Sequence, residues 1–100
     1  MKRLPVVYLP AAQRDMMDAM EYIRKDSPAA ANAWLERIDK TLGRLGDFPR
    51  SGSTPRDRRL SALGYRIAVV GEHLAFYVVR PNQVEVRRLI HGRRLYSFLL

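Results

Sequence analysis

The apolar positions of the chain follow two different periods, and the change between them predicts the order of elements. A short β-prone run from Val6 to Leu9 is long enough for one strand. From about Ala11 to Lys25 apolar residues recur at spacings of three and four, which predicts an amphipathic helix. The same spacing resumes after Ser27-Pro28, a cap followed by a proline suited to the first helical position, and continues to about Gly46. With only two residues left between the helices, we expect an antiparallel helical hairpin.

The second half of the chain has the character of a β-sheet. Three strand candidates, Tyr65 to Val70, Leu74 to Val79 and Val84 to Ile90, are joined by connections short enough for hairpins, which predicts an antiparallel meander. Between helices and strands, the stretch from Phe48 to Gly64 is rich in Gly, Pro, Ser and Arg and is expected to be a long basic surface loop. The predicted fold class is α+β, with the helical hairpin packed on one face of a small twisted sheet.

Composition fits one globular domain over residues 1–100. Of the 100 residues, 47% are apolar, which is sufficient for one core and too much for a disordered basic tail. The net charge is +8, and it is unevenly divided: residues 1–49 carry eight Lys/Arg against seven Asp/Glu, and residues 50–100 carry ten against three. The second half therefore predicts an anionic partner, although charge alone does not choose among nucleic acid, acidic protein and membrane headgroups.

Several classes of site are excluded by the residue types. There is no cysteine, so disulfides and thiolate metal sites are ruled out, and neither a cofactor nor a metal is expected. The sequence also lacks a glycine-rich phosphate loop, a metal-spaced cluster, a catalytic triad pattern and a helix-turn-helix pattern. The start of the chain has no apolar run typical of a signal peptide or membrane span, so we expect a cytoplasmic protein.

Two groups of residues are candidates for function. The last strand runs into a cationic corner, and the candidates for contact with a target are Arg87, Arg88, His91, Arg93, Arg94 and Tyr96. On regular alternation, Arg87 and Arg88 lie on opposite faces of their strand. The second group is a soft apolar cluster on the two helices, formed by Met16, Met17, Met20 and Trp34. These four are most simply explained as core, because amphipathic helices bury such stripes routinely, and their functional use requires partial exposure.

The ordered set of segments resembles the ParE/RelE superfamily of bacterial type II toxins over nearly the whole chain. It consists of VVYLPAAQRDMMDAMEYI, SPAAANAWLERI, FPRSG, HLAFYVV and VEVRRLIHGRR. The HLAFY strand and the LIHGRR ending look most like the ParE branch, whose members usually have Asp directly after the second Arg. This chain has Leu95 at that position.

Resemblance to ParE implies a toxin that binds and blocks DNA gyrase, with no catalytic residues. It also implies a cognate acidic ParD-like antitoxin whose amphipathic segment wraps the toxin, for which the cluster of Met16, Met17, Met20 and Trp34 is the candidate floor. The positive second half of the chain would speed capture of such an acidic partner.

Resemblance to the RelE branch implies a different activity, cleavage of messenger RNA in the ribosome. That chemistry needs cations for the phosphorane and a group that acts as acid or base. Arg94 falls where a catalytic arginine would lie and Tyr96 could serve as the aromatic, but His73 and Ala68 occupy two other cationic positions. His91 could titrate near neutral pH, although no carboxylate or second histidine is placed by the sequence to orient it; its alternative role is to fix the last turn.

Overall fold

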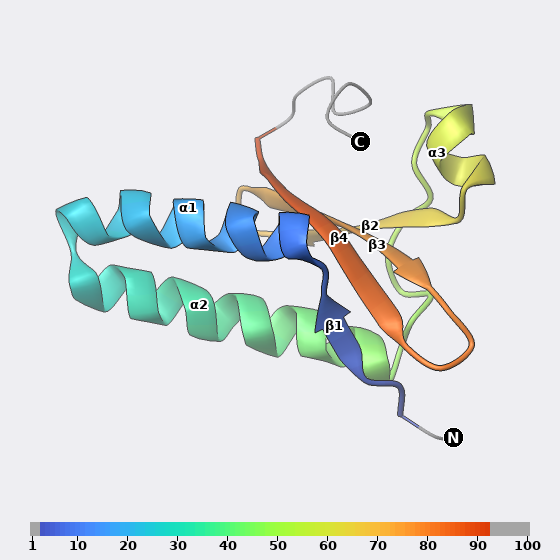
Figure 1. Ribbon diagram of the computed structural model, residues 1–100, viewed down its shortest axis with the longest axis horizontal. Coiled ribbons are helices and arrows are strands. Elements are labelled where there is room, and N and C mark those ends of the chain that lie inside the picture. Colours follow the sequence, from blue (N-terminus) through green and yellow to red (C-terminus); the bar gives the residue numbers. More distant parts are fainter. Residues whose placement is uncertain (1–2, 93–100) are drawn as a thin grey trace.

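The computed structural model describes residues 3–92, and in this part of the chain two long helices lie against a four-stranded sheet (Figure 1). In chain order the elements are β1 (Val6–Tyr8), α1 (Pro10–Asp26), α2 (Pro28–Gly43), the 3-10 turn η1 (Arg44–Gly46), α3 (Arg58–Ala62), β2 (Tyr65–Val70), β3 (His73–Val79) and β4 (Val84–His91). The α+β class, the helical hairpin and the meander are confirmed.

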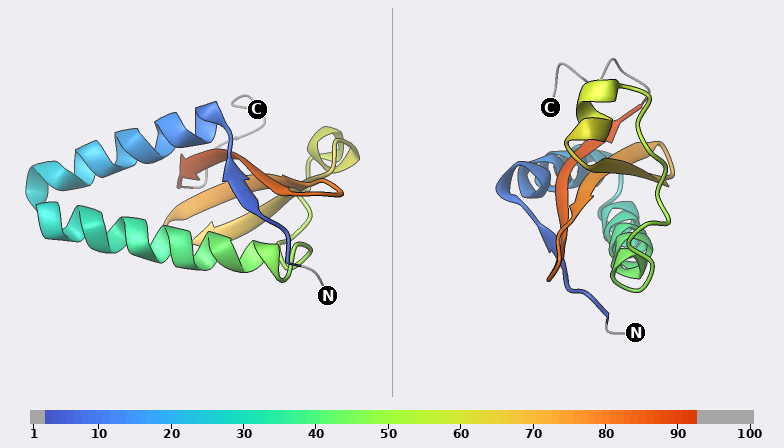
Figure 2. Two further views of the ribbon diagram at one scale, coloured as in Figure 1. Left: turned by 60° about the horizontal axis from the view of Figure 1, so that its bottom comes forward. Right: turned by 90° about the vertical axis from the view of Figure 1, so that its right-hand side faces the viewer.

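One serine ends the first helix of the hairpin and caps the second. Ser27 closes α1 by donating its backbone N–H to the carbonyl of Ile23 at 3.0 Å, and its Oγ accepts from the Ala30 N–H at 3.2 Å to cap α2. Pro28 then occupies the first helical position, where no amide partner is lost. The two helices therefore run antiparallel, and their connecting turn points away from the sheet (Figure 2).

The sheet has the strand order β1-β4-β3-β2, so the first strand lies beside the last. β1 pairs with β4 in parallel, and the other two pairings are antiparallel, which makes the sheet mixed rather than a pure meander. β1 covers only the first half of β4, since its pairing ends at Val86.

The pairing of β3 with β4 contains a bulge. Val79 pairs with Val84 and Tyr77 with Val86, but Phe76 pairs with Arg88, so Arg87 is an extra residue in β4. Without it, the residue opposite His73 would be Ile90; with it, the residue is His91. The bulge therefore decides which side chains of the second half of β4 face the helices.

The main core lies between the helical hairpin and one face of the sheet, here called the hairpin face. Its fully buried members come from every layer: Ala12, Ile38, Leu42, Ala75, Tyr77, Val84 and Val86. The hydroxyl of Tyr77 donates to the Pro49 carbonyl at 2.8 Å and accepts from the Gly52 N–H at 2.9 Å. These two hydrogen bonds hold the loop around Pro49 and Gly52 to the core.

The stretch from Phe48 to Gly64 differs from the expected surface loop. It contains α3, whose N-cap Asp57 accepts from the amides of Arg59 and Leu60 at 2.8 and 3.3 Å. Leu60 is 0% exposed and packs with Phe76 and Ile90 on the second sheet face, here called the outer face. The helical hairpin covers one face of the sheet as predicted, and α3 covers part of the other face, which was not predicted from the sequence.

Candidate functional site

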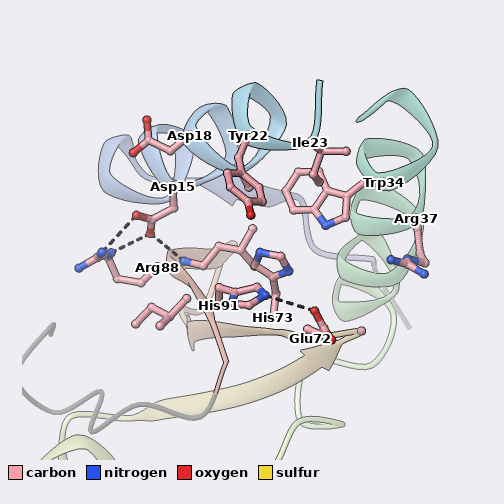
Figure 3. A pocket seen from close by; sticks show the side chains of 14 residues that line it. Asp15, Asp18, Tyr22, Ile23, Trp34, Arg37, Glu72, His73, Arg88 and His91 are labelled. Atoms are coloured by element: carbon pink, nitrogen blue, oxygen red, sulfur yellow. Dashed lines mark hydrogen bonds and ion pairs between the residues drawn. The ribbon is translucent and has the colours of Figure 1, made fainter. Parts of the chain in front are cut away.

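A groove of about 940 Å³ opens where the helical hairpin extends beyond the end of the sheet (Figure 3). One wall is formed by α1 and α2, and the floor by the turn between β2 and β3 and by the last residues of β4. The residues that line the groove include Asp15, Tyr22, Ile23, Trp34, Arg37, Glu72, His73, Arg88 and His91.

Three rings line up from the wall of the groove across its floor. The rings of Trp34 and His73 meet edge to face with centroids 5.2 Å apart, and those of His73 and His91 do the same at 4.9 Å. His73 and His91 are direct cross-strand partners, which is the consequence of the bulge in β4. The pKa of His73 is lowered, chiefly by burial and further by the positive charges of His91 and Arg37, with Glu72 acting in the opposite direction. His73 is therefore neutral at pH 7.

Glu72 supplies a carboxylate to the second histidine. It follows Gly71, which has a positive φ of 59° and turns the chain from β2 into β3. The Glu72 carbonyl accepts from the Gly92 amide at 2.8 Å, and its Oε2 lies 3.3 Å from His91 Nε2. The sequence alone places no carboxylate or second histidine beside His91, but the structure brings both there from the far end of the same hairpin.

Asp15 closes the other side of the groove. Its carboxylate accepts from Arg88 Nε at 2.7 Å and Nη2 at 3.1 Å, and from the backbone N–H of Leu89 at 2.9 Å. Leu89 lies beyond the part of β4 that β1 covers, so α1 takes over the hydrogen bonding of the strand edge there. The hydrogen bond to Asp15 raises the pKa of Arg88, and the guanidinium is neutralised within the fold.

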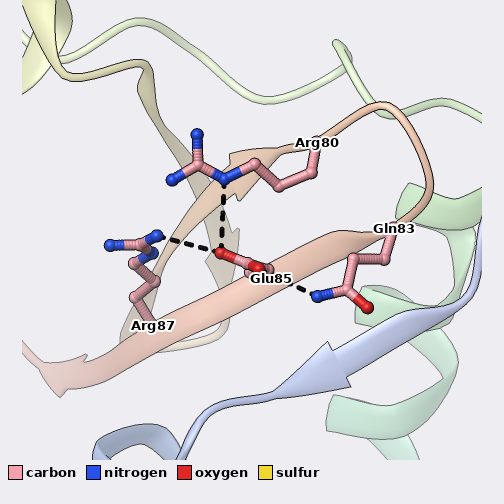
Figure 4. Close-up of polar contacts among 4 residues, drawn as sticks. All are labelled: Arg80, Gln83, Glu85 and Arg87. Atoms are coloured by element: carbon pink, nitrogen blue, oxygen red, sulfur yellow. Dashed lines mark hydrogen bonds and ion pairs between the residues drawn. The ribbon is translucent and has the colours of Figure 1, made fainter.

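Arg87 belongs to a separate polar cluster (Figure 4). Glu85 accepts from Arg87 Nη2 at 2.9 Å and from Gln83 Nε2 at 2.8 Å, and Arg80 Nε lies 3.5 Å from the same carboxylate. The hydrogen bonds from Gln83 and Arg87 lower the pKa of Glu85. Burial is the largest single effect on the pKa of Arg87 and would lower it, but the interactions with Glu85 and Tyr65 together outweigh burial and raise the pKa. The bulge lies at Arg87, so the prediction that Arg87 and Arg88 alternate between opposite faces of the strand does not hold. The two residues do differ in their ion-pair partners, which are Glu85 for Arg87 and Asp15 for Arg88.

The residues expected to contact a target thus fall into two sets. Arg87 and Arg88 are engaged in ion pairs, and His91 lies at the rim of the groove. Arg93, Arg94 and Tyr96 lie outside the described residues.

The residues expected to form an apolar floor are dispersed. Met16 is 9% exposed and Trp34 7% exposed, and both belong to the main core. Met20 is partly buried against that core, whereas Met17 is 68% exposed. Of the four, Trp34 alone lines the groove, so a common surface of Met16, Met17, Met20 and Trp34 is not formed in the described part of the chain. Ile23 and Tyr22, one helical turn further along α1, supply the apolar wall that was assigned to the methionines.

Neither a metal site nor a membrane span is found in the part of the chain that is described. Between residues 3 and 92, no three acidic or histidine side chains are grouped so that they could hold a metal ion. Within the same residues, no helix combines the length and apolar character needed to cross a bilayer.

Comparison with solved structures identifies the class of this fold. The chain is similar to a structure described as "Chromosomal ParDE TA system from P. aeruginosa", with a TM-score of 0.74 and 14% identity over 91% of this chain and 98% of that one. The two chains therefore share a fold. No curated protein matches the sequence. Residues 6–96 match the family described as "ParE toxin of type II toxin-antitoxin system, parDE", and the chain belongs to this family.

Proposed function

We propose that this ParE toxin acts by binding and inhibiting DNA gyrase in the cytoplasm, and that a cognate acidic ParD-like antitoxin neutralises it. The observation that carries the choice of binding over catalysis is the environment of two positions where the RelE-type reaction needs cations. Ala68 is packed against the main core, and His73 is neutral and flanked by the rings of Trp34 and His91. Ala68 has no charge to offer a developing phosphorane, and His73 lacks the fixed positive charge that the reaction needs.

The target contact is expected beyond the end of β4. The charges of Arg87 and Arg88 are neutralised by Glu85 and Asp15, so neither guanidinium can meet a target without breaking an internal ion pair. Arg93 and Arg94 follow directly after the His91 rim and carry the remaining positive charge of this segment. We assign the target contact chiefly to Arg93, Arg94 and Tyr96, together with His91.

The antitoxin is expected to occupy the groove. An amphipathic segment needs an apolar trough, and Ile23 and Trp34 supply one, with Met17 and Met20 on the same helix beyond it. The excess of ten basic over three acidic residues after residue 49 would accelerate its association.

One observation favours the ribonuclease alternative. Glu72 Oε2 lies 3.3 Å from His91 Nε2, and a carboxylate beside a histidine is the arrangement that orients a general base. The cations that could accompany this pair are Arg37, which lines the same groove, and the arginines that follow Gly92 in the sequence.

The two functions are separated by one pair of assays. The purified protein is added to a gyrase supercoiling reaction and, separately, to a translating ribosome reaction read by primer extension. Loss of supercoiling with intact messenger is expected. Cleavage at defined codon positions with normal supercoiling would contradict the gyrase proposal and favour the ribonuclease.

The same supercoiling assay tests the assigned contact. Replacing Arg93 and Arg94 together with Ala is expected to reduce inhibition, while antitoxin binding persists. The matched control replaces Arg56 and Arg58, an equally charged pair at the start of α3. Equal inhibition by the Arg93/Arg94 variant and the wild type would show that the basic corner does not contact the target.

A further inference from the structure

The two sides of the groove differ in charge. On one side Asp15 and Arg88 neutralise each other and Asp18 adds a second carboxylate, while Arg37 projects from α2 on the other side (Figure 3). Arg37 lies close to the turn at Gly71, where an added Cβ would come within 3.4 Å of Nη2. Among residues 3–92, Arg37 makes no ion pair and no hydrogen bond, in contrast to Arg87 and Arg88. A cation without an internal partner therefore borders the groove.

His73 adds a second unused polar group at the same place. Its ring contacts Trp34 and His91 through their faces and edges, and neither ring nitrogen has a hydrogen-bond partner within the described chain. His91, by comparison, is held by Glu72. Ile23 and Trp34 give the wall above these two groups an apolar surface.

We propose that Arg37 and His73 form a carboxylate-binding site, which takes one aspartate or glutamate side chain of the antitoxin while an adjacent apolar side chain packs on Ile23 and Trp34. The site deepens the antitoxin proposal made above and rests on it. The partner segment is thereby specified as an acidic residue next to a large apolar one, on the same face of an amphipathic segment.

The groove favours a single carboxylate over a polyanion. Three acidic side chains, Asp15, Asp18 and Glu72, line it alongside the cations. A nucleic acid strand carries a negative charge on each nucleotide and would bring several of them against these carboxylates. A peptide places one charge beside Arg37 and keeps its apolar side chains against the other wall.

Binding at this site is linked to protonation. The titratable and charged groups that line the groove with His73 are Asp15, Asp18 and Tyr22 from α1, Arg37 from α2, Glu72 from the turn, and Arg88 and His91 from β4. Of these, His91, Glu72 and Arg37 act on the pKa of His73. In the free protein His73 is neutral at pH 7 because burial and neighbouring positive charge lower its pKa. An incoming carboxylate raises that pKa, so the complex binds a proton that the free toxin does not. The affinity for the antitoxin therefore increases as the pH falls from 8 to 6, by at most about tenfold per pH unit for one proton.

The test is isothermal titration of the purified toxin with the antitoxin encoded beside it, between pH 6 and 8. Arg37→Gln is expected to weaken binding about tenfold at pH 7, since a hydrogen bond to a charged group is lost. Lys40→Gln is the matched control, because it removes the same charge from an exposed position of the same helix that does not line the groove. His73→Phe keeps a ring against Trp34 and is expected to abolish proton uptake, measured by titrating in buffers of different ionisation enthalpy.

The outcomes separate this site from the broader proposal. If the antitoxin binds and Arg37→Gln binds as tightly as wild type, with no proton uptake by the wild type, the carboxylate site is overturned while the antitoxin proposal stands. If the wild-type chain binds no antitoxin at all, both fall. Arg37 is exposed, so its variant should fold, and circular dichroism of each variant verifies this.

Discussion

Asp15 and Arg88 are separated by 73 positions in the sequence, yet the carboxylate of the first accepts two hydrogen bonds from the guanidinium of the second. The side chains are 16% and 27% exposed, so the pair is largely withdrawn from water. The same carboxylate accepts from the Leu89 amide, and one residue thereby joins α1 to the uncovered edge of β4.

Replacing Asp15 with Ala is expected to lower the free energy of unfolding by about 2–3 kcal/mol, because Arg88 and the Leu89 amide both lose their acceptor. Urea unfolding followed by circular dichroism measures the change. Glu21→Ala is the control: Glu21 pairs with Arg24 on the same helix at 3.2 Å, but both side chains are more than half exposed. That variant should differ from wild type by less than about 0.5 kcal/mol. Equal effects at the two positions would contradict the structural role of Asp15.

The second prediction concerns α3 and the outer face of the sheet. Leu60→Ala is expected to cost about 2–4 kcal/mol, since Leu60 is fully buried against Phe76 and Ile90. Leu63, three positions later, is 57% exposed, and Leu63→Ala should change the free energy of unfolding by about 0.5 kcal/mol or less. Similar stabilities of the two variants, measured by urea unfolding, would mean that the stretch is the plain surface loop that its composition favours.

The hydroxyl of Tyr77 provides a third prediction. Tyr77→Phe leaves the Gly52 amide and the Pro49 carbonyl without their partner, and the free energy of unfolding should fall by about 1–2 kcal/mol. Tyr22→Phe, at an exposed tyrosine, is the matched control and should be neutral. Amide hydrogen exchange should also become faster around Gly52 in the first variant. Unchanged exchange there would show that the hydroxyl does not hold the loop.

The fourth prediction is the pH dependence of stability in the free toxin. Burial lowers the pKa of His73 in the folded state below its unfolded value near 6.5, so the unfolded chain binds more protons in the interval between the two. The contribution of His73 to the free energy of unfolding is therefore fully present above about pH 6.5, and it is lost as the pH falls through that interval. Urea unfolding at steps from pH 8 to 5.5 measures this slope, and in His73→Phe it should be smaller. An identical slope in both proteins would assign the pH dependence to other groups.

The regular parts of this fold could be predicted from the sequence because each has a strong local pattern. β2 has the predicted bounds Tyr65–Val70, and β3 and β4 each extend one residue beyond the prediction. The boundary between α1 and α2 lies at Ser27, which ends the first helix and caps the second, and Pro28 begins the second helix. α3 was missed because it spans only five residues, and its cap Asp57 stands among arginines that suggest a solvated loop.

The site was less predictable because long-range contacts build it. Nothing local in the sequence brings Asp15 to Arg88. The pairing of His73 with His91 could be found only by counting along the hairpin and including the bulge, for which Arg87 carries no distinctive signal. The methionines were misleading because their helix is amphipathic: Met16 faces inward and Met17, one position on, faces solvent.

The extra residue in β4 has a consequence for comparing this strand with those of other chains. Before Arg87 the even-numbered residues, Val84 and Val86, face the helices, and after it the odd-numbered residues, Leu89 and His91, do so. Suppose this strand is aligned without a gap to a relative that lacks the extra residue. Core positions of one chain would then be matched with surface positions of the other, either before or after Arg87. Deleting Arg87 would leave each remaining cross-strand pair in register. Relatives whose β4 is one residue shorter can thus present the same groove, and a single gap placed at Arg87 is the alignment that would reveal it.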